Sequence, residues 1–100
     1  MPETQVVFHR LAAREYRSAQ DWYAARSVEV AERFRRAVDR AVERITMQRD
    51  ALPRLGSAYR WVRVSRFPYI LIFRDQSPST VMVVAVAHTS RRPGYWRRRR

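Results

Sequence analysis

The hydrophobic pattern of this 100-residue chain changes its period once, and that change constrains the fold more than any other feature. Between residues 11 and 45, apolar side chains recur at steps of three and four, which is typical of amphipathic helices. Later they form short runs at 59–65, 69–74 and 81–88, which are typical of strands. A short apolar run at 6–8 predicts one more strand before the helices. The sequence therefore predicts one domain in the order β-α-α-β-β-β.

The helical part divides into two helices joined by a turn at Ala24–Arg26. Ser27 is placed to cap the second helix, because its hydroxyl can accept a hydrogen bond from the first turn. That helix is expected over 28–49, roughly 33 Å long, with Pro53 and Gly56 ending the region. Two amphipathic helices with a short link form an antiparallel hairpin. Two outer-face ion pairs are expected at four-residue spacing, Glu29 with Arg33 and Glu32 with Arg36.

The predicted fold class is α+β, with the helical hairpin packed on a mainly antiparallel, four-stranded sheet in two layers. The domain is expected over 1–96, followed by a disordered basic tail over 97–100. The runs at 70–73 and 81–87 do not alternate with polar residues, so both faces of the sheet are apolar. The face without helices must be covered by the segment Pro93–Trp96, by curling of the sheet, or by another chain.

Composition excludes several classes of protein. The chain has no cysteine and no lysine, so it forms no disulfide, no Cys-ligated metal site and no Schiff base. Its two glycines, Gly56 and Gly94, are too far apart for a glycine-rich nucleotide loop. No cofactor is therefore expected. The longest apolar run, seven residues at 81–87, is far below the roughly 20 that cross a bilayer. With no signal sequence at the start, the sequence predicts a soluble, cytoplasmic protein without a membrane partner.

Proton-transferring residues are few. His88 ends an apolar strand, where it could carry a proton near neutral pH or simply pack through a hydrogen bond. His9, between the first strand and the first helix, is expected to cap that helix locally. Two histidines without clustered acids do not define a metal site. The helical carboxylates are expected to be solvated charges: Glu15, Asp21, Glu29, Glu32, Asp39 and Glu43.

Arginine dominates the charge. The net charge is +12, and residues 51–100 hold eleven arginines and one acid, which gives +10 for that half. Arginines and aromatic residues interleave there, at Arg60, Arg63, Arg66, Arg91 and Arg92 with Trp61, Tyr95 and Trp96. This combination suits phosphate pairing and base stacking. It suits a carboxylate-rich protein surface equally well, so both kinds of partner remain open at this point.

Three segments resemble the RelE/ParE toxin superfamily: Arg66–Phe73, Val84–His88 and Arg91–Trp96. The element Ala12-x-x-Glu15-Tyr16 fits the helical hairpin of that superfamily, and the resemblance covers roughly residues 5–96. It implies that the first strand lies beside the last. It also implies a toxin of a bacterial type II toxin–antitoxin module, held inactive by an acidic antitoxin that wraps around it. The expected antitoxin-binding residues are those of the uncovered apolar face: Ile70, Ile72, Val84 and Val86.

The superfamily has two activities, and the resemblance implies one of them. RelE-like members cut messenger RNA on the ribosome, whereas ParE-like members bind DNA gyrase and block it. Ile70 and Thr89 stand where the nuclease branch has arginines, so the ParE-like activity is favoured, with a target-binding set of Arg91, Arg92, Tyr95 and Trp96. The alternative is a ribosome-dependent endoribonuclease that would use His88, Tyr95, Arg60, Arg63 and Arg91.

Overall fold

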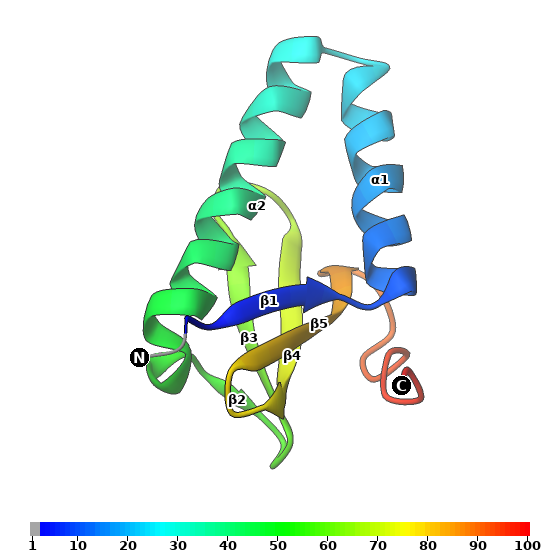
Figure 1. Cartoon of the computed structure of the whole chain (residues 1–100). Coiled ribbons are helices and arrows are strands. Elements are labelled where there is room, and N and C mark those ends of the chain that lie inside the picture. The colour runs from blue at the N-terminus through cyan, green and yellow to red at the C-terminus, as the bar shows by residue number, and fades with distance from the viewer. Residues whose placement is uncertain (1–2) are drawn as a thin grey trace.

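The computed structural model describes residues 3–100 and shows two layers, a helical hairpin lying on one face of a five-stranded sheet (Figure 1). The elements are β1 (Gln5–Phe8), α1 (Arg10–Ala24), α2 (Val28–Gln48), the short 3-10 helix η1 (Arg49–Ala51), β2 (Arg54–Leu55), β3 (Tyr59–Val64), β4 (Tyr69–Ser77) and β5 (Thr80–His88). The predicted α+β class and the helical hairpin are confirmed.

The sheet has the strand order β1-β5-β4-β3-β2. β1 runs parallel to β5, and the other neighbours are antiparallel, so the first strand lies beside the last as expected. The sequence predicted four strands, and β2 is the fifth. It pairs with β3 through two residues only, and in the turn that joins the two strands Gly56 adopts the left-handed conformation at φ 69°. The expected loop at 75–79 is shorter, because β4 continues through Ser77.

Both helices begin at the predicted caps. His9 Nδ1 accepts a hydrogen bond from the Leu11 N–H (3.1 Å), and Ser27 Oγ accepts one from the Val30 N–H (3.2 Å). Each cap satisfies a backbone donor that the first helical turn leaves free. The expected outer pair of Glu32 with Arg36 forms at 3.6 Å. Within residues 3–100, Glu29 and Arg33 do not pair, and the ion pairs of this face centre instead on Arg35, which contacts Glu32 and Asp39.

The main core lies between the helices and the inner face of the sheet, the face that they cover. At its centre Phe34 is fully buried, and rings from both layers pack around it, those of Tyr16, Tyr23, Phe67 and Tyr69. Trp22 lies within the apolar pattern of residues 11–45, but 54% of it is exposed. Figure 1 shows the reason: the hairpin projects beyond the sheet where the two helices join, and Trp22 lies close to that end.

A second apolar cluster covers the outer face, opposite the helices, and Trp96 from the C-terminal segment forms its lid. Trp96 is 3% exposed and meets the ring of Tyr59 edge to face at 4.6 Å. Within this cluster, Ile72 and Val84 are buried beneath Trp96. Of the three expected ways to cover this face, the structure shows the segment of the chain itself. No helix among residues 3–100 has the length and apolar character to span a membrane.

Candidate functional site: the Glu15 clasp and the cleft beside helix α1

The free edge of β5 is the starting point of the site. β1 pairs only with Thr80–Val83 of this nine-residue strand, and the His9 N–H extends the cover by one bond, to the Val83 C=O. The rest of the edge would leave backbone groups without partners, which is costly where they are buried. Side chains replace the missing strand here. Glu15 accepts from the Val86 N–H (3.0 Å), and the guanidinium of Arg99 donates to the Val84 C=O (2.9 Å).

These side chains form a cluster that we term the Glu15 clasp: Glu15, Arg91, Tyr95 and Arg99. Arg99 grips the carboxylate through two parallel hydrogen bonds of 2.8 and 2.9 Å. The Tyr95 hydroxyl donates a third at 2.8 Å, and Arg91 lies at 3.4 Å. The Glu15 and Arg99 side chains are only 15% and 12% exposed. A bidentate, partly buried pair of this kind is among the stronger polar contacts in proteins. It ties the C-terminal segment to α1 across more than 80 residues of sequence.

The clasp raises the pKa of Tyr95. Burial raises the pKa of its phenol well above the ordinary value, and the hydrogen bond to Glu15 and the Glu15 charge raise it further. The phenol, which like any tyrosine is protonated at neutral pH, acts as a donor to Glu15. The hydrogen bond to Glu15 also raises the pKa of the Arg99 guanidinium. Arg91 lies 3.8 Å above the Tyr95 ring, an arrangement in which a cation is attracted to the ring face.

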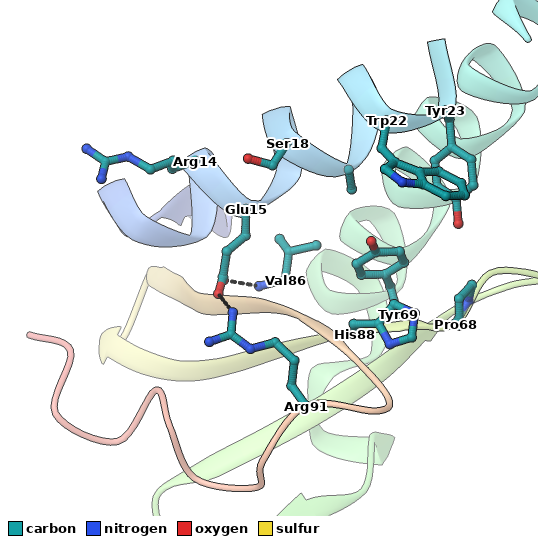
Figure 2. A pocket seen from close by; sticks show the side chains of 11 residues that line it. Arg14, Glu15, Ser18, Trp22, Tyr23, Pro68, Tyr69, Val86, His88 and Arg91 are labelled. Carbon is teal, nitrogen blue, oxygen red and sulfur yellow. Dashed lines mark hydrogen bonds and ion pairs between the residues drawn. The ribbon is translucent and has the colours of Figure 1, made fainter. Parts of the chain in front are cut away.

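A cleft of about 600 Å³ opens beside the clasp, between α1 and the ends of β4 and β5 (Figure 2). Trp22 and Tyr23 form its helical side, and Tyr69 and His88 form its floor on the sheet. The His88 ring meets the Tyr69 ring edge to face at 5.1 Å. Its Nδ1 accepts from the Ser90 N–H at 3.1 Å and lies 2.7 Å from the Ser90 hydroxyl. The cleft thus joins exposed aromatic surface to a cationic rim at Arg91.

The residues of the predicted nuclease set do not converge on one point. His88 and Arg91 line the cleft, and Tyr95 lies in the clasp. Arg60, however, pairs with Phe73 on the sheet and donates to the Leu52 C=O at 2.7 Å, beside the C-terminal end of the helical region. Arg63 is exposed on β3, opposite Ile70. The set is therefore divided between separate parts of the sheet.

The structure buries several of the predicted binding residues. Trp96 is buried as the lid of the outer cluster, so it presents no free face to a target. Ile72 and Val84 lie beneath that lid, and Val86 packs in the helix-side core, so these three do not form an open antitoxin surface. Ile70 is partly exposed. Arg92 is exposed, and the Arg91 side chain is 52% exposed.

Residues 97–100 were predicted to form a disordered basic tail, but one of them, Arg99, belongs to the Glu15 clasp. Arg99 is held by Glu15, and the Arg100 C=O lies 3.0 Å from His9 Nε2, whereas Arg97 and Arg98 are exposed. Tertiary contacts therefore hold Arg99 and Arg100 in place, although a run of four arginines is usually solvated.

Glu15 is the residue of this candidate site that the sequence analysis missed, since it was expected to be a solvated helix charge. The signal was present in the spacing. Ala12, Glu15 and Ala19 follow one another at three and four residues, and both alanines are buried, so Glu15 lies on the buried stripe of α1. Within residues 3–100, no three carboxylate or histidine groups are placed to hold a metal ion together.

Comparison with known proteins identifies the class. The two-layer fold matches a solved structure titled "Chromosomal ParDE TA system from P. aeruginosa" with a TM-score of 0.71 and 16% sequence identity, over 86% of this chain and 96% of that chain. A family model described as "ParE toxin of type II toxin-antitoxin system, parDE" matches residues 6–93. Comparison with curated protein sequences gave no match. The chain belongs to the ParE toxin family of type II toxin–antitoxin systems.

Proposed function

We propose that this toxin inhibits DNA gyrase by binding it, and that a cognate acidic antitoxin neutralises it in the bacterial cytoplasm. The observation that carries the proposal is the match of the ParE family model to residues 6–93. Gyrase is the target that the ParE-like branch of the superfamily implies. Fold alone does not define a target, and the site residues give the proposal further support.

The site supports binding over catalysis. Cleavage of RNA needs a base for the 2′-hydroxyl, an acid for the leaving oxygen and a cationic clamp on the phosphate. Arginine cannot serve as the base, and Tyr95 is held protonated by burial and by Glu15. Arg60 is engaged with the Leu52 C=O, away from His88. Of His88, Arg14 and Arg91 in the cleft, only His88 can transfer a proton, so separate groups do not fill both the acid and the base role.

The gyrase-contacting surface is proposed to be the cationic segment that follows β5. Arg91 and Arg92 supply its exposed charge. Tyr95 and Trp96 belong to the same segment, but they act as its anchors, one on Glu15 and the other on the outer face of the sheet. Two anchors keep the arginines in a fixed position, which lowers the ordering cost of binding.

The antitoxin is proposed to occupy the cleft beside α1. Trp22 offers an exposed aromatic anchor there, and aromatic anchors in concave sites carry much of the affinity of protein interfaces. A net charge of +12 favours an acidic partner and its fast association. We expect Trp22→Ala to weaken antitoxin affinity at least tenfold in a titration of the purified pair. Val28→Ala, which removes an apolar side chain that is 77% exposed and outside the cleft, is the matched control and should leave affinity unchanged.

A supercoiling assay with purified gyrase tests the proposed target. The toxin should abolish supercoiling at low micromolar or lower concentration, and antitoxin added first should restore it. Primer extension on ribosome-bound message, run with the same preparation, should show no new cleavage sites. Full gyrase activity at a large excess of toxin, or cleavage of the message, would overturn the proposal.

A further inference from the structure

A second hollow lies between α2 and the turn that joins β3 to β4, away from the Glu15 clasp. Its volume is about 490 Å³, and four arginines line it with no acidic residue: Arg33, Arg36, Arg40 and Arg66. We term it the α2 basic cleft. The sequence analysis treated the arginines of this helix as a solvated face, and the proposed gyrase and antitoxin contacts do not use them.

The guanidinium groups of this cleft are available to a ligand. Within the described residues, Arg33, Arg40 and Arg66 take part in no ion pair or side-chain hydrogen bond, and Arg36 has only the 3.6 Å contact with Glu32. All four arginines are exposed. The Glu29 that was expected to neutralise Arg33 does not do so. Four like charges along one cleft, only one of which has an acidic neighbour, raise the affinity of the site for an anion.

The backbone at Arg66 supports a role for its side chain. Arg66 has φ 70°, and it is the only non-glycine residue among those described with a positive φ. That conformation suits glycine and is unfavourable for a residue with a Cβ. Arg66 adopts this conformation beside three helical arginines. The energetic cost of the backbone strain is offset if its side chain holds a ligand.

We propose that the α2 basic cleft binds the phosphate backbone of duplex DNA. Arg33, Arg36 and Arg40 are spaced along one side of a rigid helix over about 10.5 Å of axial rise. That length corresponds to about three base-pair steps of 3.4 Å along one strand. Arginine is suited to phosphate because its planar fork donates two hydrogen bonds at once. Two apolar residues, Val30 and Phe67, line the cleft, but both are partly buried and the Phe67 ring packs against Phe34, so neither is a free anchor for an acidic peptide.

This inference goes beyond gyrase binding and stands independently of it. It assigns the toxin a contact with DNA on the helical layer, whereas the proposed protein contacts lie on the segment after β5 and in the cleft beside α1. The contact is to backbone phosphates, so it is expected to show no sequence preference.

The test is fluorescence anisotropy of a labelled 20-base-pair DNA duplex with the full chain, between 50 and 200 mM KCl. The cleft variant carries Arg33→Gln, Arg40→Gln and Arg66→Gln. The control carries Arg10→Gln, Arg17→Gln and Arg98→Gln, three exposed arginines outside the cleft, and loses the same charge. We expect the cleft variant to bind at least tenfold more weakly at 100 mM KCl, with a log–log salt slope smaller by about 2.7, since each lost phosphate contact removes about 0.9. The control should change affinity less than threefold.

A single change separates binding from folding. Arg66→Gly relieves the backbone strain, so its melting temperature should equal or exceed that of the parent protein while its DNA affinity falls at least threefold. Three results would overturn the proposal: equal losses in the cleft and control variants, tighter binding of single-stranded RNA than of the duplex, or cleft-dependent binding of a glutamate-rich 20-residue peptide with DNA affinity unaffected.

Discussion

Replacing Glu15 with glutamine should destabilise the protein far more than the loss of an ordinary surface charge. Glutamine keeps the shape and one acceptor oxygen, but it removes the charge that faces Arg99, Arg91 and the Tyr95 hydroxyl. Arg99 would be left 12% exposed without a counterion, and the Val86 N–H would have to share the one remaining oxygen. Hydrogen bonds to charged groups contribute about 1.5–3 kcal/mol, and breaking a fully buried pair costs about 3–5 kcal/mol. For this partly buried pair we expect a loss of about 2–3 kcal/mol in the free energy of unfolding.

Urea denaturation followed by circular dichroism measures this loss, and thermal melting gives a second readout. At about 4–8 °C per kcal/mol for a domain of this size, the melting temperature should fall by roughly 10–20 °C. Glu32→Gln is the matched control, because it makes the same chemical change in an exposed helical pair, where solvent screens the charges, so its loss of stability should be much smaller. The reasoning is refuted if the two variants lose the same stability within error. Combining Glu15→Gln with Arg99→Gln should show a coupling energy of at least about 1 kcal/mol.

Three further predictions concern the C-terminal segment and its anchors. Tyr95→Phe should reduce the loss of stability at alkaline pH. Because the pKa of Tyr95 is raised in the folded state, its contribution to the free energy of unfolding is complete below the unfolded-state pKa of about 10 and is lost as pH rises above it. Unfolding free energies measured from pH 8 to 11 should therefore converge between variant and parent as pH rises. Trp96→Ala should cost about 3–5 kcal/mol in urea denaturation, because it opens the outer cluster; a cost below about 1 kcal/mol would mean that the lid is not docked in solution. His9→Ala should cost about 1 kcal/mol through the lost cap of α1, which helical circular dichroism during thermal melting would register; an unchanged melting temperature would contradict that role.

Local patterns predicted the architecture well. The change of hydrophobic period separated the helices from the strands, and Ser27 and His9 were recognised as caps because capping depends on neighbours two or three residues away. β2 was not predicted, because a strand of two residues is too short to show a hydrophobic period. The extension of β4 through Ser77 was missed for another reason. The polar residues at 75–79 predicted a loop, but the pairing with β5 continues to Ser77 opposite Thr80.

The site was less predictable because it depends on contacts between distant segments. Arg99 read as part of a solvated tail, and only its approach to Glu15, 84 residues away, gives it a fixed place. Trp96 was recognised as a possible cover for the outer face, but its packing on Tyr59 depends on the folded sheet. Glu15 could have been found from its spacing between Ala12 and Ala19, since a carboxylate on a buried stripe needs a partner.

The central claim is that the Glu15 clasp holds the segment after β5 in the position that engages the target. The most direct measurement is the toxin concentration that halves gyrase supercoiling, for the parent protein, Glu15→Gln and Glu32→Gln, at a temperature where circular dichroism shows all three folded. We predict that Glu15→Gln needs at least tenfold more protein, because its arginines are no longer fixed, and that Glu32→Gln matches the parent. Equal potency of all three proteins would contradict the account.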